Sequence, residues 1–313
     1  MKKISYFAPA KVIISGEHSV VYGKPALVCA LDLELKFSVW ESNITSKDKN
    51  TLIISKIVKK YLKENNIKFN NKSFLYKVKS NIPIGRGLGS SAAFSVAAVA
   101  SFLEFFTNKN YENKKEIINN LAYLAEKHFH KDPSGVDNSI SCFGGLLYYR
   151  KEFEFLKNIS ELNFKFPKKI EAKLYLIDSG APKEKTVDMV ENVRKLYCKD
   201  IEKIEDLLNK AEKITKRILI SILKQDIDFL KKNILENQII LEDLGVVSDK
   251  TKRLLKSLKS FGIGKITGAG GKKKGSGFIL FLSENNKALE KYLAKNNICY
   301  YNFKQDFKGL RKE

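Results

Sequence analysis

Three glycine-rich segments hold most of the residues in this sequence that could perform chemistry. They are APAKVIISGEHSVVYGKPA (residues 8–26), PIGRGLGSSAA (83–93) and KITGAGGKKKGSG (265–277). A short fourth segment, PSGVD (133–137), lies between the second and the third. Each combines glycine with lysine, serine, threonine or a carboxylate, which are the groups that bind phosphate or move a proton.

The second segment has the composition of a phosphate-binding loop. Gly85, Gly87 and Gly89 leave the backbone bare where it must turn tightly, and the alanine-rich run that follows predicts a buried helix starting near Ser91. The first turn of a helix has unpaired N–H groups and partial positive charge, which favour an anion. The segment lacks the Gly-Lys-Ser/Thr end of a P-loop and the Rossmann glycine spacing, so a different phosphate cradle is indicated. A glycine-rich turn capped by serine is the structural alternative.

Phosphoryl transfer to an alcohol needs in-line positioning, charge screening on the phosphates and a group that accepts the alcohol proton. Asp137 is the best candidate for that base, because it follows a Pro-Ser-Gly turn from which a short side chain can face a cleft. Taken alone, an aspartate here more often caps a strand or turn. By the same reasoning Lys11 could be one more solvated lysine, Glu126 a solvated glutamate at a helix edge, and His18 a packing residue.

The composition is that of a folded protein with two domains. At 313 residues and 43% hydrophobic content, the chain is long enough for two packed cores. The formal net charge of +22 could serve nucleic-acid binding, but only six of the 57 basic residues are arginine and the lysines are scattered over every segment. We therefore expect no nucleic-acid partner, and we expect the charge to attract anionic substrates such as ATP. A basic nucleic-acid-binding protein is the alternative from another functional class.

The N-terminal residues lack the apolar core of a signal peptide, and no stretch approaches eighteen uncharged apolar residues. We therefore expect a cytoplasmic protein with no membrane partner. The cysteines are far apart and show no CxxC spacing, so we expect buried free thiols rather than disulfides or zinc ligands at Cys29, Cys142, Cys198 and Cys299.

The apolar periodicity predicts an α+β fold with a domain boundary near residue 168, where FPKK interrupts the pattern. The expected domains are residues 1–167 and 168–313. In chain order, we expect strands within 3–40, a helix over 51–68, a strand over 73–85, helices over 91–106 and 114–130, strands over 139–155 and 172–180, helices over 187–260, then a sandwich-like end with a helix over 285–296.

The order of these segments resembles the GHMP kinase superfamily, and within it the mevalonate kinases. GEHSVVYG resembles the first family motif, GRGLGSSAA the ATP loop, DPSGVDNSIS the substrate and base motif, and KITGAGG the third motif. LIDSGAPKEKTVDMVENV and ENQIILEDLGV are similar to family segments of the C-terminal half, so the resemblance spans nearly the whole chain. It implies a two-domain α+β fold, with an N-terminal ribosomal-protein-like β/α domain and a C-terminal ferredoxin-like α/β sandwich with added helices.

The resemblance implies phosphorylation of mevalonate at its 5-hydroxyl, with ATP and Mg²⁺, to give 5-phosphomevalonate and ADP for isoprenoid synthesis. Asp137 would take the hydroxyl proton, and Lys11 would keep it ionised and stabilise the developing alkoxide. Ser90 and Glu126 would hold the magnesium ion. The nucleotide would contact the loop and helix start at Pro83, Gly85, Arg86, Gly87, Leu88, Gly89, Ser90, Ser91 and Ala92.

Substrate contacts also follow from the resemblance. Glu17 and His18 correspond to family residues near the mevalonate hydroxyl and carboxylate, and the third motif would close the phosphate site from the other domain. A tight turn between two strands is the alternative for that motif. The full expected set is Lys11, Glu17, His18, Asp137, Tyr149, Thr186, Thr267 and Gly268, with Gly270 and Gly271 completing the third motif.

The expected partners are mevalonate and ATP, and a homodimer is frequent in the family. A superfamily kinase acting on homoserine or on the 3-hydroxyl of mevalonate is the close alternative. Two departures from the family pattern stand out. Ala10 replaces a common glycine, with little expected consequence, and Lys272–Lys274 replace further glycines, either as a phosphate-facing patch or as an exposed loop.

Overall fold

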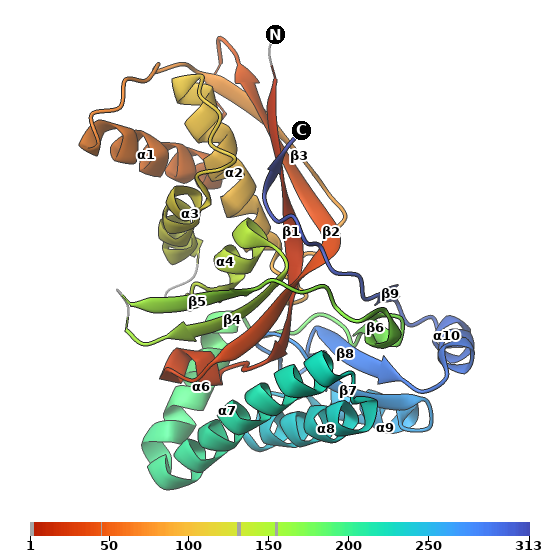
Figure 1. Cartoon of the computed structure of the whole chain (residues 1–313). Coiled ribbons are helices and arrows are strands. Elements are labelled where there is room, and N and C mark those ends of the chain that lie inside the picture. The colour runs from red at the N-terminus through yellow and green to blue at the C-terminus, as the bar shows by residue number, and fades with distance from the viewer. Residues whose placement is uncertain (1–2, 45, 130–132, 154–155) are drawn as a thin grey trace.

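The chain forms two antiparallel sheets with helices packed against them (Figure 1). The computed structural model describes residues 3–44, 46–129, 133–153 and 156–313. The α+β fold and its two-domain organisation, predicted from the sequence, are confirmed.

The first sheet is built on two long strands that pair along most of their length. Strands β1 and β2 are antiparallel, and an irregularity in their register falls between Pro9 and Ala10, just before Lys11. The sheet order is β10-β1-β2-β4-β5, with β3 also pairing with β2. The strands are β1 (Ile4–Ser15), β2 (Ala26–Glu41), β3 (Phe74–Ser80), β4 (Leu146–Lys151), β5 (Lys157–Leu162) and β10 (Arg311–Lys312).

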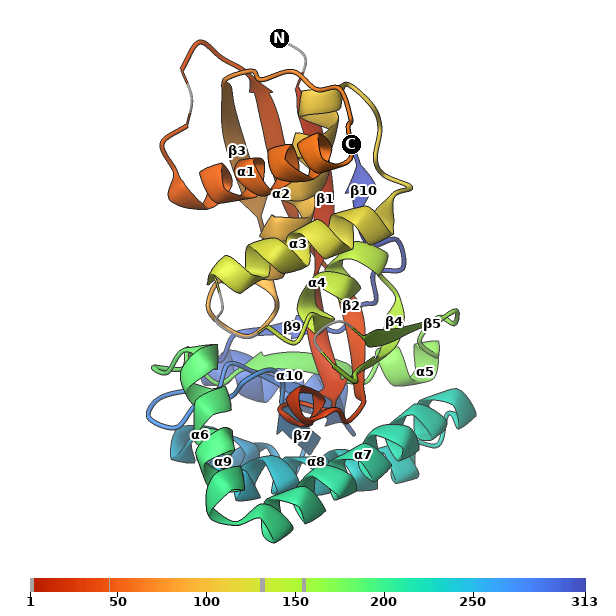
Figure 2. The same cartoon turned by 90° about the vertical axis from the view of Figure 1, so that its left-hand side faces the viewer.

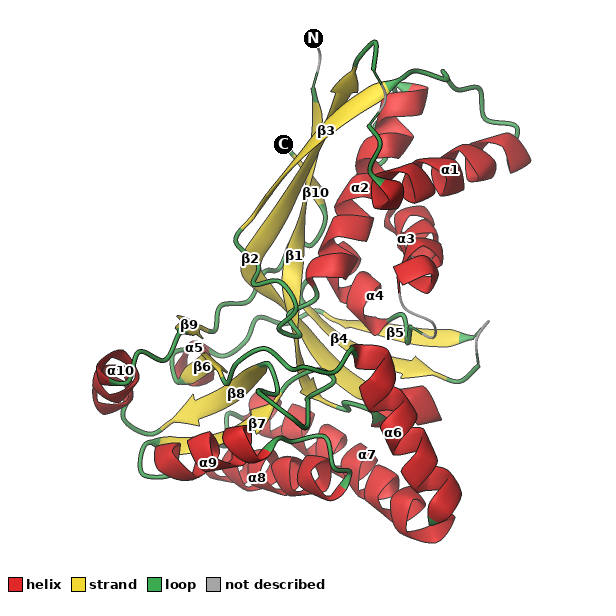
Figure 3. Cartoon of the chain, turned by 180° about the vertical axis from the view of Figure 1, so that it is seen from behind, coloured by secondary structure: helices red, strands yellow, loops and turns green. Residues whose placement is uncertain are grey.

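Four helices lie on one side of this sheet, as the view from behind in Figure 3 shows. They are α1 (Lys49–Glu64), α2 (Ser90–Thr107), α3 (Lys115–Phe129) and α4 (Val136–Phe143), and a short 3-10 helix η1 (Ser19–Tyr22) links β1 to β2. Helix α2 is central, because it packs on β1, β2, α1, α3 and α4. Its alanines let it approach the sheet closely, and nearly every residue from Ala92 to Phe106 is buried.

Within the described part of the chain, α2 is also the one helix long and apolar enough to cross a membrane by length and composition. However, 78% of that window is buried inside the fold. Such burial is typical of the core helix of a soluble protein.

The second sheet has the order β7-β8-β6-β9, and all its pairs are antiparallel. Its strands are β6 (Leu174–Asp178), β7 (Gly262–Ile266), β8 (Phe278–Ser283) and β9 (Tyr300–Asn302). The helices of this half are α5 (Lys168–Glu171), α6 (Thr186–Lys199), α7 (Ile201–Lys224), α8 (Ile227–Asp243), α9 (Asp249–Leu258) and α10 (Asn286–Lys295). Figure 2 shows α7 and α8 at the end of the molecule opposite both chain termini.

The long charged helices predicted over 187–260 owe their position to one apolar face. In α7 the buried residues recur at a helical period, so one stripe packs inward while lysines and glutamates stay in solvent. These buried positions are Ile204, Leu207, Leu208, Ala211, Ile214, Ile218 and Ile222.

Three expectations change in detail. Residues 139–143, predicted as strand, belong to α4, and the strand begins only at Leu146. Cys29 and Cys142 are buried free thiols as predicted, but Cys198 and Cys299 are exposed. The last residues return to the first sheet, where Arg311 and Lys312 pair with Phe7 and Tyr6. The domain boundary near residue 168 stays a prediction. Strand β10 follows that position in the sequence but belongs to the first sheet, where it pairs with β1.

Candidate active site

The glycine loop leads directly into the head of α2. Gly85, Gly87 and Gly89 have φ angles of 68°, 85° and 77°, in the left-handed region that glycine adopts without strain. Leu88 is buried and its carbonyl oxygen accepts a hydrogen bond of 3.0 Å from the Lys11 backbone N–H, which fixes the loop to β1. Gly89 is the N-cap and no side chain caps this helix, so the first-turn amides are available to an anion.

Lys11 and Asp137 form an ion pair beside this loop. Lys11 Nζ lies 3.0 Å from Asp137 Oδ1; the lysine side chain is 3% exposed and that of Asp137 39%. Lys11 points from the middle of β1 toward α4, whose first turn carries Asp137. Asp137 follows the Pro-Ser-Gly turn, as expected, but it lies in a helix and not in a loop. A left-handed Gly135 ends the turn, and α4 starts at Val136. The open carboxylate and the buried ammonium make a proton acceptor held beside a fixed positive charge.

Tyr149 supports the turn that precedes Asp137. It is completely buried on β4, and its hydroxyl donates a hydrogen bond of 2.6 Å to the carbonyl oxygen of Ser134. A Cβ on Gly135 would lie 2.8 Å from that hydroxyl, so a side chain at Gly135 would push the tyrosine away. Tyr149 thus touches the Asp137 turn from behind.

Glu126 is the buried carboxylate of the site. It is 3% exposed on α3 and accepts hydrogen bonds from Ser95 Oγ (2.8 Å) and Ser91 Oγ (3.3 Å) of α2. Its pKa is raised from 4.5 to about 7, by burial above all and also by the nearby Asp137 charge, against the lowering effect of the hydroxyl hydrogen bonds. The alternative interpretation, in which Glu126 is a solvated residue at a helix edge, is wrong. Ser90, the predicted ligand, is the first residue of α2, and the hydroxyl that contacts Glu126 belongs to its neighbour Ser91.

The segment after β1 contacts the third glycine-rich segment. Glu17 forms a buried ion pair with Lys265 of β7. His18 has a positive φ of 59°, and its Nε2 lies 3.0 Å from the carbonyl oxygen of Ala269. Burial lowers the His18 pKa to about 4, so near neutral pH the ring is uncharged and Nε2–H donates to Ala269.

The third segment touches both other segments. Thr267 Oγ1 accepts a hydrogen bond of 2.9 Å from the Ile13 backbone N–H. A Cβ on Gly87 would lie 3.2 Å from the Thr267 carbonyl oxygen, and one on Gly268 would lie 3.4 Å from Gly87. Gly270 has no room for a side chain, because its Cβ would lie 2.0 Å from the Val246 carbonyl oxygen.

Thr186 lies farther out than the other predicted contacts. It is exposed and is the first residue of α6. The preceding Glu184 accepts hydrogen bonds from the backbone N–H groups of Lys272 (3.2 Å) and Lys273 (3.1 Å), so the exposed lysine loop binds a carboxylate of its own chain. Arg86 of the glycine loop is likewise engaged, in an ion pair with Asp178 of β6.

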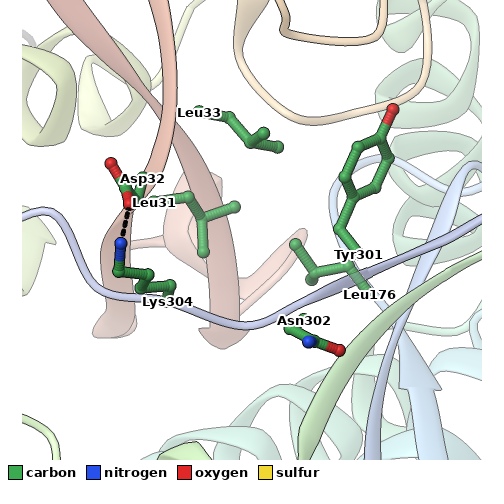
Figure 4. A pocket seen from close by; sticks show the side chains of 7 residues that line it. All are labelled: Leu31, Asp32, Leu33, Leu176, Tyr301, Asn302 and Lys304. Carbon is green, nitrogen blue, oxygen red and sulfur yellow. Dashed lines mark hydrogen bonds and ion pairs between the residues drawn. The ribbon is translucent and has the colours of Figure 1, made fainter.

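A small separate pocket lies where β2 approaches β6 and β9 (Figure 4). It has a volume of about 150 Å³ and is lined by Leu31, Asp32, Leu33, Leu176, Tyr301, Asn302 and Lys304. None of the predicted site residues lines it. Leucine and tyrosine dominate its wall, and Asp32 pairs with Lys304.

Comparison with known proteins finds relatives over most of the chain. Residues 52–145 match the model of the GHMP kinases N terminal domain. A mevalonate kinase of Pyrococcus abyssi is 33% identical over 302 residues, covering 84% of this chain and 85% of that protein. A mevalonate kinase of Methanocaldococcus jannaschii is 30% identical, covering 94% and 97%.

The chain belongs to the mevalonate kinase family of GHMP kinases. The crystal structure of the Methanococcus jannaschii mevalonate kinase superposes with a TM-score of 0.76 at 23% identity, covering 97% of this chain and 99% of that one. The fold is therefore that of the GHMP kinases throughout, and this family member is an enzyme of the kinase class.

Two residues of the site were not predicted. Ser95 lies four positions after Ser91, so the helical period could have placed both hydroxyls on the face toward Glu126. Lys265 opens the third segment, but nothing in its sequence context separates it from the exposed lysines at 272–274.

We expect a side chain at Gly89 to disturb the pair of Lys11 and Asp137. A Cβ there would lie 2.6 Å from Lys11 Cγ, whereas one on Gly85 would meet nothing within 4 Å. Both substitutions strain a left-handed backbone by about 1–2 kcal/mol, but only Gly89→Ala must move Lys11. We expect both variants to lose unfolding free energy, Gly89→Ala more than Gly85→Ala, and a fall of about 10²-fold in kcat only for Gly89→Ala. Equal kcat values in the two variants, measured on samples that urea unfolding shows to be folded, would contradict this.

We also expect Glu126 to destabilise the metal-free protein above neutral pH. Its folded pKa of about 7 exceeds the unfolded value of 4.5, so its favourable contribution is complete below pH 4.5 and is lost as the pH rises through 7. The difference corresponds to about 3 kcal/mol. In EDTA, Glu126→Gln should therefore gain stability over the wild type between pH 5 and pH 8 in urea unfolding. Glu116→Gln, on an exposed position of the same helix, is the control and should follow the wild type.

Proposed function

We propose that the protein transfers the γ-phosphoryl group of ATP to the 5-hydroxyl of mevalonate, giving 5-phosphomevalonate and ADP in isoprenoid synthesis. The observation that carries the proposal is the ion pair of Lys11 and Asp137, 3.0 Å long, beside the uncapped head of α2. The mevalonate kinases among the relatives support mevalonate as the acceptor, since their similarity covers most of the chain.

In this proposal Asp137 accepts the proton of the attacking hydroxyl. Its carboxylate is the exposed member of the pair and can reach a substrate, while Lys11 is buried and cannot leave. As the O–H bond breaks, negative charge develops on the alcohol oxygen, and the fixed Lys11 ammonium stabilises it. The oxygen then forms the new P–O bond as the bond to ADP breaks, and the proton stays on Asp137.

The glycine loop and the first turn of α2 would hold the nucleotide phosphates through backbone N–H groups. Glu126 with the hydroxyls of Ser90 or Ser91 would hold Mg²⁺, which when bound screens the phosphate charge. A buried carboxylate and a serine hydroxyl are hard oxygen donors of the type this ion takes, and the remaining ligands commonly come from phosphate and water. The described residues contain no group of three or more His, Cys, Asp or Glu that could form an all-protein cage.

The acceptor would bind between the first and third segments. His18 donates through Nε2 to Ala269, which leaves Nδ1 as an acceptor for a substrate hydroxyl. Tyr149 acts on the acceptor through the Ser134 turn, because its hydroxyl is already engaged there. Thr186, at the exposed start of α6, would reach the acceptor only if that end of the helix moves inward. We further propose a cytoplasmic location. We also propose a homodimer, which a measurement of the molecular mass in solution tests.

The acceptor can be assigned by an ADP-release assay across mevalonate, homoserine, galactose and phosphomevalonate. We expect ADP release with mevalonate alone, and a product phosphorylated at the 5-hydroxyl by ³¹P and ¹³C NMR. Release with homoserine, or phosphorylation at the 3-hydroxyl, would instead assign the neighbouring superfamily activity.

The role of Asp137 predicts that Asp137→Asn folds and binds ATP but loses about 10²- to 10⁴-fold in kcat, since an amide cannot accept the proton. Asp228→Asn is a matched control, because Asp228 also lies in the first turn of a helix and pairs with a lysine, at 3.5 Å from Lys231. Its kcat should equal that of the wild type. Near wild-type turnover of Asp137→Asn would remove Asp137 as the base.

A further inference from the structure

Lys265 is a fully buried lysine with all three protons engaged. Its side chain has 0% exposure, and its ammonium donates to Glu17 Oε1, to the Ile266 carbonyl oxygen at 2.8 Å and to the Ile13 carbonyl oxygen at 3.4 Å. A lysine ammonium has three donors and no acceptor, so its hydrogen-bonding capacity is exhausted within the protein. Lys265 therefore has no donor left for a substrate.

The partner carboxylate is equally enclosed. The side chain of Glu17 is 1% exposed, and its Oε2 has no hydrogen-bond partner among the described residues. Burial raises the pKa of Glu17 and lowers that of Lys265, so each charge depends on the other. Two described charged groups act on Glu17, namely Lys265 on β7 and Lys11 on β1. His18, the next residue in the sequence, is neutral.

A buried pair of this kind is a weak source of stability, because well-packed apolar residues often replace one without loss. Its place in the fold suggests a different role. Residues 13–18 meet residues 265–269 through four polar contacts: the Lys265–Glu17 pair and the hydrogen bonds Lys265–Ile13, Ile13–Thr267 and His18–Ala269. Thr267 and Gly268 then touch Gly87 of the phosphate loop.

We propose that Lys265 is a positioning residue, which holds the Glu17 carboxylate away from Lys11 and fixes the first segment to the third. The proposal rests on the phosphotransfer function proposed above. With Lys265 present, Glu17 is neutralised locally and Lys11 pairs with Asp137. Without it, a buried unpaired carboxylate lies within the electrostatic reach of Lys11 and competes with Asp137 for that ammonium.

A double-mutant cycle with Lys265→Met, Glu17→Gln and the double variant tests this. Lys265→Met leaves the carboxylate unpaired, whereas the double variant removes both charges at similar volume. Lys312→Met is the matched control, since Lys312 also pairs with a buried glutamate, Glu104, at 2.6 Å on the C-terminal strand β10. Each variant is assayed for kcat, for the KM values of ATP and mevalonate, and for the urea midpoint at pH 5 and pH 8.

We expect Lys265→Met to lose about 10²-fold in kcat with the KM of ATP unchanged. The double variant should recover about tenfold of that loss. An unpaired buried Glu17 has a raised folded pKa, so the urea midpoint of Lys265→Met should fall more below wild type at pH 8 than at pH 5. The double variant should show no such pH dependence, and Lys312→Met should keep the kcat of the wild type because Lys312 and Glu104 lie outside the three glycine-rich segments.

Wild-type kcat in Lys265→Met, or a double variant no more active than Lys265→Met, would overturn the proposal. If Lys265→Met does not fold, a folded double variant within tenfold of wild-type kcat supports it, and an unfolded or inactive one overturns it. The urea midpoints need no substrate. A wild-type protein that phosphorylates no mevalonate would thus refute the proposed function while leaving the charge coupling of Glu17 and Lys265 measurable.

Discussion

The site depends on keeping one lysine ammonium out of water and beside one aspartate. Lys11 is 3% exposed, so its charge must be balanced by a nearby carboxylate, and Asp137 at 3.0 Å supplies it. This requirement explains much of the surrounding architecture. Strand β1 must carry Lys11 beneath the glycine loop, Gly89 must lack a side chain where the lysine stem passes, and α4 must begin at Val136 so that Asp137 faces the strand. Because only Asp137 reaches solvent, its carboxylate is accessible from outside while the Lys11 ammonium stays buried.

The glycines of the three segments serve close backbone approach as much as turning. A Cβ on Gly16 would lie 2.5 Å from Ala26 Cα, and one on Gly275 would lie 2.0 Å from the Gly180 carbonyl oxygen. The first contact closes the connection between β1 and β2, and the second joins parts of the chain that are distant in sequence. The polar contacts between residues 13–18 and 265–269 add direction to this packing, because hydrogen bonds fix the register that close approach alone would leave free. The phosphate loop is consequently bounded by both sheets.

Periodicity predicted most elements because one face of each is buried. The apolar runs of β1 and β2 and the helical stripe of α7 face packed cores, so their patterns survive in the sequence. Helix α4 was predicted as strand because Ser139, Ile140, Ser141 and Cys142 alternate polar and apolar residues, yet all four are buried between α2, α3 and the sheet. Side-chain direction was harder. Whether Tyr149 contacts a substrate or Ser134 depends on how β4 lies behind the turn. The residues around Tyr149 in the sequence do not determine that arrangement.

The lysine-rich composition makes burial, rather than residue type, the property that distinguishes functional lysines here. Most lysines are solvated and can be exchanged at little cost, whereas Lys11 and Lys265 are buried and each pairs with a carboxylate, and Lys265 also donates to two backbone carbonyl oxygens. Arginine could replace neither easily, because its planar guanidinium is larger and carries five donors that these enclosures would leave partly unpaired. The compact ammonium of lysine matches one carboxylate and one or two carbonyl oxygens. Two buried ammonium groups near one another can persist only if separate carboxylates serve them, and Glu17 and Asp137 divide that task between β7 and β1.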